Sequence, residues 1–256
     1  MKRTDYSSSE LIAIVLSRDL KDGEIGMLGA YSEIPQASIR LAQLTHAPGL
    51  SCIYGASGGY NRKGPLCHYV GEFGNLTGAE AVFPLDTILD LVSKRMDFFF
   101  AGGFQVDQYG NLNLVCAGNH EKPALRGPGT AGLAISCSIF KRFYIYLQSH
   151  RKQSLVPKVD FVSGAGFVNG FNTRLEQGIP EGGPRLLMTP LGLFDFDPVS
   201  KRMRLNSLNP GTVLDQVIKN TGFELIIPER VPETLPPTEE ELRILREKVD
   251  PLGFLR

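Results

Sequence analysis

The sequence predicts an α/β fold built on a parallel sheet, and two observations support this prediction. The first is a β-α-β alternation near the start of the chain, with a strand at 24–28, a helix at 35–45 and a strand at 50–54. The second is the apolar run Phe98–Ala101, which is bounded by two glycines and is typical of a buried strand. Right-handed crossovers place the connecting helices on the faces of such a sheet.

Local patterns predict the other elements. Ser7–Ser9 precede apolar residues at helical spacing, which predicts a helix that ends at Asp22–Gly23. Further strands are expected at 112–116, 142–147, 159–162, 186–189, 193–196 and 204–208, and further helices at 86–95, 210–220 and 238–249. The apolar segment 133–138 fits either a short helix or a strand. Segments 55–78 and 119–132 have no clean period, and long loops of this kind in compact domains are often functional.

The C-terminal part has a different composition. Four prolines between Pro228 and Pro237 predict an extended segment, and Thr238 with Glu241 forms a capping box for a last helix. We therefore expect residues 1–227 to form the α/β domain. Residues 228–256 are expected to form a proline-rich arm and a helix that packs on this domain or on a partner.

Charge and cysteine content exclude several classes of protein. Lys+Arg and Asp+Glu are both 27, so no excess positive charge favours nucleic acid or an anionic membrane surface. No apolar run reaches the ~18 residues of a membrane helix and no signal peptide precedes the first helix, so we expect a cytoplasmic protein. The four cysteines form no C-x-x-C pair and the histidines have no metal-ligand spacing, so no metal site is predicted. The basic segment 149–153 is expected to be solvated.

Gly55–Gly59 satisfies the G-x-S-x-G pattern of a nucleophile elbow and follows a predicted strand. An α/β-hydrolase also needs an acid and then a histidine after the serine, but the last histidine is His150, more than a hundred residues before the C-terminus. The hydrolase interpretation therefore fails, although Ser57 remains a candidate for a site role. His68 and His120 lie in irregular segments and are the histidines worth testing.

Residues 127–132 satisfy G-x-G-x-x-G, the pattern of a dinucleotide-binding turn. The pattern requires a strand before it and an acid about 20 residues later, whereas 120–126 is not strand-like and the next acid is Asp160. What remains is a run of small residues whose backbone N–H groups could hold an anion or a developing oxyanion. Lys122 and Arg126 would favour an anion there, or they could be solvated residues beside a turn.

Several segments, taken in order, resemble the B (β) subunit of glutaconate CoA-transferase and its relatives in the class I CoA-transferase superfamily. The segments are the first helix, 45–48, F-A-G-G-F-Q-V-D-Q-Y-G-N-L-N at 100–113, 122–123 before the glycine turn, 158–162, 191–196 and 220–223. The resemblance implies a three-layer α/β/α fold with a mostly parallel central sheet and a separate A (α) subunit in an α2β2 assembly. It also implies a coenzyme A thioester as substrate, no permanently bound cofactor, and a turn of Gly129, Thr130, Ala131 and Gly132 whose backbone holds the thioester carbonyl.

The sequence departs from the family pattern at one position. Transferases of this family carry a glutamate just after the strand equivalent to 50–54, and its carboxylate attacks the thioester. Here Gly55 occupies that position or, with one inserted residue, Ala56 does, and neither side chain can form a covalent intermediate.

Two similar branches also lack this glutamate in the B subunit. In 3-methylglutaconyl-CoA decarboxylase a cysteine stands there, but Cys52 lies three residues too early for that role. In the ring-opening CoA hydrolases of steroid catabolism, the A subunit supplies the glutamate and the B subunit shapes the pocket.

We therefore expect a B subunit that processes an acyl-CoA by hydrolytic ring opening, C–C cleavage or decarboxylation, with its catalytic residue unknown. The acyl pocket is expected to include Tyr54, Gly55, Ala56, Gly58, Gly103 and Gln105. Two alternatives stay open: a genuine glutaconate-type CoA-transferase subunit, and a non-catalytic assembly partner of the A subunit.

Overall fold

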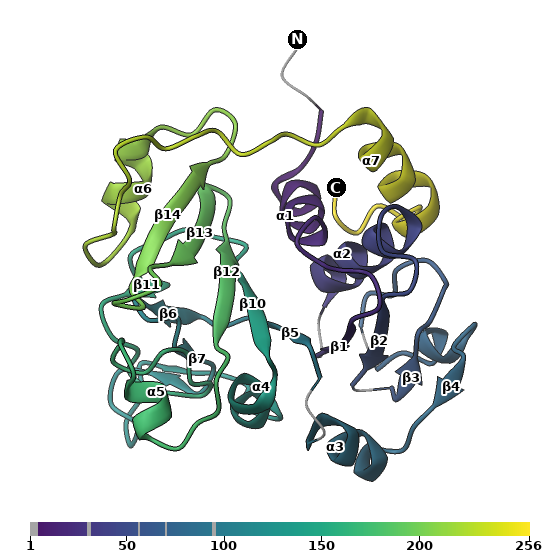
Figure 1. Cartoon of the computed structure of the whole chain (residues 1–256), viewed down its shortest axis with the longest axis horizontal. Helices are drawn as coiled ribbons and strands as arrows, with labels where there is room; N and C mark the ends of the chain where they lie inside the picture. Colours follow the sequence, from purple (N-terminus) through teal and green to yellow (C-terminus); the bar gives the residue numbers. More distant parts are fainter. Residues whose placement is uncertain (1–4, 30–31, 56, 70, 94–95) are drawn as a thin grey trace. The chain divides into compact units, whose positions relative to one another are not determined.

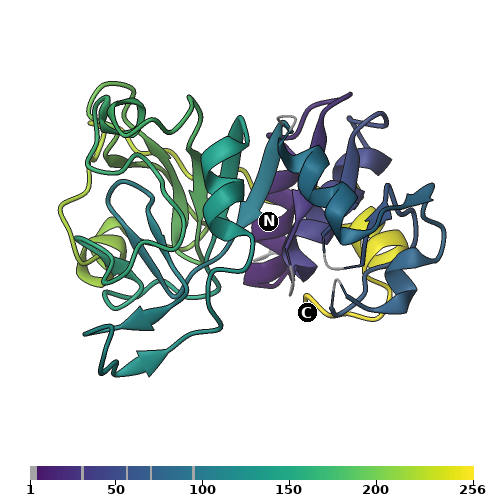
Figure 2. The ribbon, with the colours of Figure 1, turned by 90° about the horizontal axis from the view of Figure 1, so that it is seen from below.

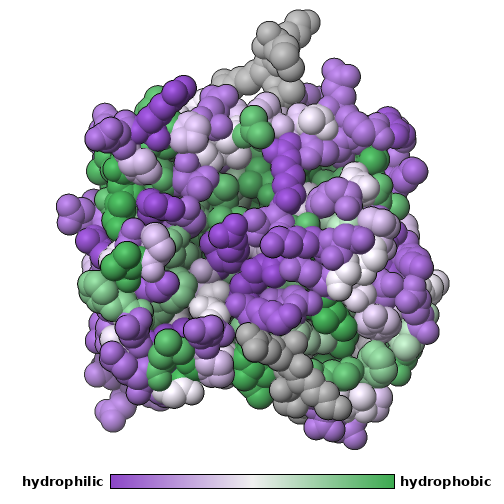
Figure 3. Space-filling model, viewed as in Figure 1, coloured by the Kyte–Doolittle hydropathy of each residue, from purple (hydrophilic) through white to green (hydrophobic). Residues whose placement is uncertain are grey.

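The computed structural model describes residues 5–29, 32–55, 57–69, 71–93 and 96–256. Contacts divide the chain into two compact units, Met1–Phe100 with Leu235–Arg256, and Ala101–Thr234. We describe each unit by itself. Within the described residues, no helix combines the length and the apolar character that crossing a membrane would require. On the face shown in Figure 3, polar side chains alternate with small apolar patches.

The first unit contains the predicted β-α-β arrangement. Its strands follow the order β5-β1-β2-β3-β4. Strand β1 (Ile25–Leu28) pairs in parallel with β2 (Ser51–Tyr54) and with β5 (Phe98–Ala101). The short strands β3 (Gly59–Tyr60) and β4 (Ala81–Val82) add antiparallel pairs. Parallel pairing is thus confirmed at β1, and the sheet becomes antiparallel towards β4.

Helices cover this unit. They are α1 (Ser8–Ser17), α2 (Glu33–Leu44), the 3-10 turn η1 (Phe73–Leu76), α3 (Leu85–Ser93), and α7 (Glu239–Ile244), which continues as the π-helical turn η2 (Leu245–Val249). In Figure 1, β1 and β2 lie between α2 and α3. Helix α2 connects β1 to β2 and α3 connects β4 back to β5, and crossovers of the same hand that run in opposite directions place their helices on opposite faces of a sheet. The predicted capping box at Thr238 is present, and Ser7, one of the serines before the first helix, forms a second one with Glu10.

The C-terminal segment packs on the first unit (Figure 2). Arg246 pairs with the carboxylate of Glu10 at 2.7 Å, and Arg18 pairs with Glu241 at 2.7 Å. Glu10 is only 1% exposed, so α1 and the C-terminal turn are joined by a largely buried ion pair.

The second unit has a four-strand arrangement and smaller strand pairs. Its main strands follow the order β14-β13-β12-β10, with bounds Met203–Leu208, Gly192–Phe196, Pro184–Met188 and Arg142–Tyr146. Only the β10–β12 pair in this set is parallel. The smaller strands are β6 (Gln105–Asp107), β7 (Leu112–Asn113), β8 (Cys116–Ala117), β9 (Leu125–Arg126) and β11 (Leu155–Val156), and the helices are α4 (Leu133–Ile139), α5 (Thr173–Glu176) and α6 (Leu214–Asn220).

A polar hairpin follows β5. Strands β6 and β7 pair antiparallel, and the buried carboxylate of Asp107 accepts hydrogen bonds from the N–H groups of Tyr109 and Asn111. Gly110 has φ +71°, which glycine adopts without a Cβ clash.

Some predicted elements were wrong. Residues 159–162 form no strand; the strand of this region is β11, which pairs with β6 before Pro157. Helix α6 begins at Leu214 instead of 210, because a turn closed by the hydrogen bond from Thr212 N–H to the Asn209 carbonyl precedes it. Helix α3 begins at Leu85, one residue before the predicted start, and residues 94–95, where the helix was expected to end, lie outside the described residues. Segment 55–78 contains β3 and η1, and residues 125–126, in the segment judged not strand-like, form β9. Residues 133–138, for which a helix or a strand was expected, are helical.

Candidate functional site

Gly55 lies directly after β2, where the family glutamate would stand. Its N–H donates to the carbonyl oxygen of Leu28 at 3.1 Å, which continues the pairing of β2 with β1. A Cβ at Gly55 would lie 2.8 Å from that same oxygen, closer than real Cβ atoms approach a backbone oxygen. Gly55 therefore has no side chain, and the Leu28 carbonyl oxygen blocks the space that a side chain would occupy. Ala56, the alternative position, lies outside the described residues.

The following turn closes on the carbonyl of Tyr54. The N–H groups of Ser57 and Gly58 donate to it at 3.1 and 2.8 Å, and the Ser57 hydroxyl donates to it at 3.4 Å. Gly58 has φ +79° and packs against the Phe83 carbonyl, so it needs to be glycine. All described contacts of the Ser57 hydroxyl are with backbone groups of Tyr54 and Gly59, so the structure gives this serine no general base.

Tyr54 itself is 1% exposed. Burial raises the pKa of its phenol, although the nearby guanidinium groups of Arg40 and Arg62 oppose the shift. Its hydroxyl has no hydrogen-bond partner within the described parts of the chain. The side chain of Tyr54 is therefore closed off from solvent in this chain, and its contact with an acyl group stays a prediction.

Polar side chains of α2, together with Arg62, hold the backbone of the loop after β3, a feature that sequence reasoning missed. Arg62 is 5% exposed and donates to the carbonyls of Pro65 and, at 2.9 Å, Gly74. Arg40 donates to the Lys63 carbonyl at 3.0 Å, and Gln36 bonds both backbone groups of Cys67. The sequence pattern that could have indicated this feature is the pair Gln36 and Arg40, two polar residues four positions apart in a helix that is otherwise buried.

The predicted oxyanion turn lies in the second unit, before α4. The N–H of Gly129 donates to the Leu114 carbonyl at 3.0 Å, so this group is already engaged. Among the described residues, no acceptor is found for the N–H groups of Thr130, Ala131 and Gly132. Gly129 and Ala131 have φ of +98° and +42°, which bends the chain into the turn. These three successive N–H groups precede a helix and are therefore available to an anion.

Gly103 and Gln105 also lie in the second unit, close to each other. The Gln105 amide is buried and hydrogen-bonded at both ends: its oxygen accepts from Asn113 at 2.6 Å and its nitrogen donates to Asp160 at 2.9 Å. A Cβ on Gly103 would meet the carbonyl oxygens of Gln105 and Asn113 at 3.1 and 3.2 Å. These contacts give Gln105 a structural role in the hairpin, and its contact with an acyl group stays a prediction.

The other candidate groups have simpler surroundings. His68 lies 2.9 Å from the Glu33 carboxylate and is largely exposed. His120 is exposed and stacks on Phe161 with ring centroids 5.3 Å apart. Burial raises the pKa of the Cys52 thiol, which is 1% exposed and therefore unreactive. No cluster of metal-ligating side chains is found in the described ranges.

Comparisons with known proteins agree with the resemblance. The family model "Coenzyme A transferase" matches residues 10–220. The chain is 35% identical to the B subunit of 3-oxoadipate CoA-transferase from Pseudomonas knackmussii over 246 residues, which cover 94% of this chain and 92% of that protein. It is 29% identical to the cholesterol ring-cleaving hydrolase IpdB subunit of Rhodococcus jostii, with 97% and 94% covered.

Solved structures show the same fold. The crystal structure of glutaconate coenzyme A-transferase from Acidaminococcus fermentans superposes with a TM-score of 0.90 at 26% identity, with 98% of each chain covered. The decarboxylase AibA/AibB superposes with a TM-score of 0.83 at 24% identity, covering 98% of this chain and 97% of that one. The predicted α/β CoA-transferase fold is confirmed, and the chain belongs to the coenzyme A transferase family.

Proposed function

We propose that this chain is the B subunit of a heteromeric enzyme that acts on an acyl-CoA thioester, and that it supplies no carboxylate nucleophile. Family membership and two relatives described as B-type subunits support the first part. The proposed reaction is hydrolytic C–C cleavage, as in ring opening, or decarboxylation. Coenzyme A enters as part of the substrate, and the proposal requires no permanently bound cofactor.

One observation carries the second part of the proposal. At the end of β2, the carbonyl oxygen of Leu28 occupies the space into which a side chain on Gly55 would project. The segment 54–59 contains no acidic residue. A carboxylate that carries the acyl group or CoA is therefore excluded from this turn by composition, and the backbone packing disfavours its return by a single substitution.

The turn before α4 would stabilise the negative charge that develops on the thioester oxygen in both proposed reactions. In decarboxylation, the C–C bond to the departing carbon dioxide breaks and its electron pair moves into the thioester enolate oxygen. In hydrolytic C–C cleavage, water adds to a ketone β to the thioester, and the bond between the ketone carbon and the α carbon breaks to leave a carboxylic acid. The electron pair of that bond forms the same thioester enolate, and solvent then protonates the α carbon. Donors such as the N–H groups of Thr130, Ala131 and Gly132 stabilise that oxygen, and one such donor contributes about 10²–10³-fold in rate.

A second candidate function is CoA transfer, which the 35% identity to a 3-oxoadipate CoA-transferase subunit favours. A transferase of this kind would need a nucleophile outside the 54–59 turn. The acids nearest in sequence are already engaged: Glu33 pairs with His68, and Glu72 accepts from the Tyr69 N–H. A third possibility, a B subunit that only supports assembly of the A subunit, is tested by substitution of the turn at Gly129.

The discriminating experiment uses the co-expressed complex of the A and B subunits with a panel of acyl-CoA esters. Products are identified by mass spectrometry with and without acetate as acceptor. Carbon dioxide or a hydrated ring-opened CoA ester that forms without acetate would support the proposal. Acetyl-CoA that forms only with acetate would establish a transferase and overturn it.

A further inference from the structure

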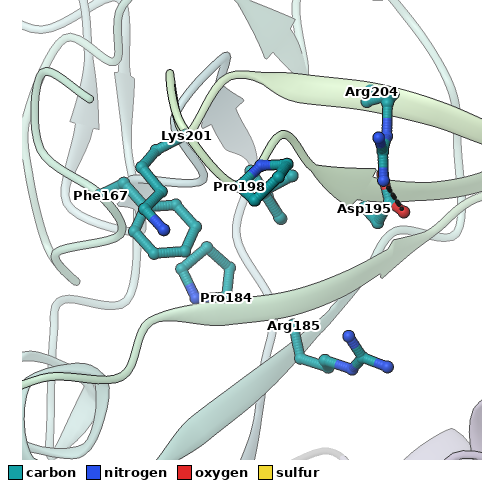
Figure 4. Close-up of a pocket in the computed structure, with 8 residues that line it drawn as sticks. Phe167, Pro184, Arg185, Asp195, Pro198, Lys201 and Arg204 are labelled. Carbon is teal, nitrogen blue, oxygen red and sulfur yellow. Dashed lines mark hydrogen bonds and ion pairs between the residues drawn. The ribbon is translucent and has the colours of Figure 1, made fainter. Parts of the chain in front are cut away.

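The second unit has a cavity that none of the predicted acyl-CoA site residues line. It has a volume of about 320 Å³, near the lower end of the range for small-molecule sites. Phe167, Pro184, Arg185, Asp195, Phe196, Pro198, Lys201 and Arg204 line it (Figure 4). The walls thus combine aromatic and proline rings with cationic groups, a combination suited to an anion with an apolar body.

The apolar wall is preorganised. The rings of Phe167 and Phe196 meet edge to face with centroids 5.3 Å apart. Pro184 and Pro198 extend this surface, and proline rings lose little conformational freedom when a ligand packs against them. An apolar group entering the cavity would therefore meet a fixed surface.

The charged side chains that line the cavity differ in whether they already have a partner of opposite charge. Arg204 holds the Asp195 carboxylate with two hydrogen bonds of 2.8 and 2.9 Å, so these two charges neutralise each other. Lys201 has no carboxylate partner within the described parts of the chain, and its ammonium lies 5.4 Å from the centroid of the Phe167 ring. Arg185, the third cation of the lining, has an interaction partner of its own, so Lys201 is the cation that is positioned for an incoming anion.

The backbone around the cavity adopts unfavourable conformations. Lys201, Val168 and Phe171 have φ of +60°, +60° and +48°, a region that side chains other than glycine rarely adopt. Asn111 clamps Val168 through both of its backbone groups, at 2.8 and 3.2 Å. The N–H of Phe171 donates to the Ser200 carbonyl at 3.2 Å, which joins the segment of Val168 and Phe171 to the turn that contains Lys201. Such conformations persist where surrounding contacts enforce them, and they cluster at ligand sites.

A glycine at position 201 would satisfy this turn at lower conformational cost. A lysine there instead places an ammonium over the aromatic wall (Figure 4). We propose that this cavity binds a small carboxylate with an apolar body, with the ring or alkyl group against Phe167 and Phe196 and the carboxylate at Lys201.

The test uses the full-length chain and phenylacetate as probe, followed by calorimetric titration. Phenylacetamide keeps the ring and removes the charge, and acetate keeps the charge and removes the ring. We expect phenylacetate to bind and both analogues to bind about tenfold more weakly or worse. Equal binding of phenylacetamide, or no binding of phenylacetate at millimolar concentration, would overturn the proposal.

Two variants separate binding from folding. Lys201→Gly removes the ammonium and relieves the left-handed backbone, so we expect a higher melting temperature and loss of phenylacetate affinity of about tenfold or more. Lys219→Gln removes an exposed cation from α6 and should change neither affinity nor the preference for phenylacetate. Retained affinity in Lys201→Gly, or displacement of phenylacetate by CoA, would show that the probe binds elsewhere and would contradict the assignment.

Discussion

The guanidinium group of Arg174 donates a hydrogen bond to the carbonyl oxygen of Cys137 at 2.8 Å, at the C-terminal end of α4. It also donates to the carbonyl of Ser138 at 3.0 Å, and to the carbonyls of Ala165, Gly166 and Pro180. Arg174 is 3% exposed, so one buried cation satisfies the end of this helix. Because the other end of α4 follows the 129–132 turn, Arg174 helps to fix the direction of the turn's free N–H groups.

Arg174→Met is expected to destabilise the chain by about 3 kcal/mol or more, because it leaves several buried carbonyls without their donor. Unfolding in urea, followed by circular dichroism, measures this loss. Arg174→Lys should recover part of the stability, since an ammonium donates to fewer carbonyls than the planar guanidinium does. Arg126→Met, which removes an exposed arginine with one bond to the His120 carbonyl, is the matched control and should stay within about 0.5 kcal/mol of the parent.

Gly129→Ala tests whether the turn takes part in catalysis. A Cβ there would meet no neighbouring atom, so the cost comes from the φ of +98° and should be about 1 kcal/mol. We expect the complex with the A subunit to assemble and kcat/KM to fall by about 10-fold or more, the effect of one misplaced donor. Size-exclusion chromatography and steady-state kinetics measure the two quantities.

Gly178→Ala is the matched control for this substitution. Gly178 also has a positive φ, +73°, and open space around its Cβ position, but it follows α5. It should lose similar stability and keep full turnover. Unchanged turnover in Gly129→Ala would favour a B subunit that only supports assembly.

Much of the fold could be predicted because its signals are local. The strands at β1, β2 and β13 follow from short apolar or alternating runs, and the α7 capping box involves residues three apart. Residues 159–162 do not form the predicted strand because Asp160 is hydrogen-bonded to residues far away in the sequence. The carboxylate of Asp160 accepts from Gln105 and from the Gly118 N–H, which holds the backbone outside a ladder.

Two features of the candidate site could be predicted from the sequence: the missing carboxylate after β2 and the run of small residues with backbone donors at 127–132. The absence of a carboxylate after β2 can be read from Gly55 directly. The carbonyl of Leu28 that occupies the space, and the carbonyl of Leu114 that engages Gly129, depend on strand and hairpin pairing across 27 and 15 positions (55 − 28 and 129 − 114). Single-residue patterns contain no information on such partners.

His150 should make stability depend on pH. It lies in the segment predicted to be solvated, yet it is 7% exposed and bonds the hydroxyls of Thr189 and Thr221 at 2.9 and 3.1 Å. Burial lowers its pKa to about 4, against 6.5 for an ordinary histidine. Between these values the unfolded chain binds the additional proton, so stability is full above pH 6.5 and falls by at most about 3 kcal/mol as pH drops towards 4.

Urea unfolding at several pH values measures this slope. In His150→Gln the part of the slope between pH 6.5 and 4 should disappear, although the variant should be less stable at neutral pH because its amide cannot reproduce both threonine contacts. His46→Gln replaces an exposed histidine and serves as the control. The same slope in parent and His150→Gln would contradict a buried, neutral His150.

Gly55→Glu tests whether the missing nucleophile can be restored. The new side chain would meet the carbonyl oxygen of Leu28 at its first carbon, so we expect a loss of about 1–3 kcal/mol and no acetate-dependent formation of acetyl-CoA in the complex with the A subunit. Hydroxylamine trapping in the presence of acyl-CoA should label no carboxylate on this chain.

Gly55→Ala meets the same oxygen without adding a carboxylate and is therefore the matched control. Because both variants force β2 and β1 to shift, they should lose similar stability and similar turnover. If Gly55→Glu alone gains acetate-dependent transfer and a trapped glutamyl ester, the backbone of β1 accommodates a nucleophile, and this enzyme differs from a transferase only by one side chain. If both lose turnover equally, the packing of Leu28 against Gly55 separates this site from that of a transferase.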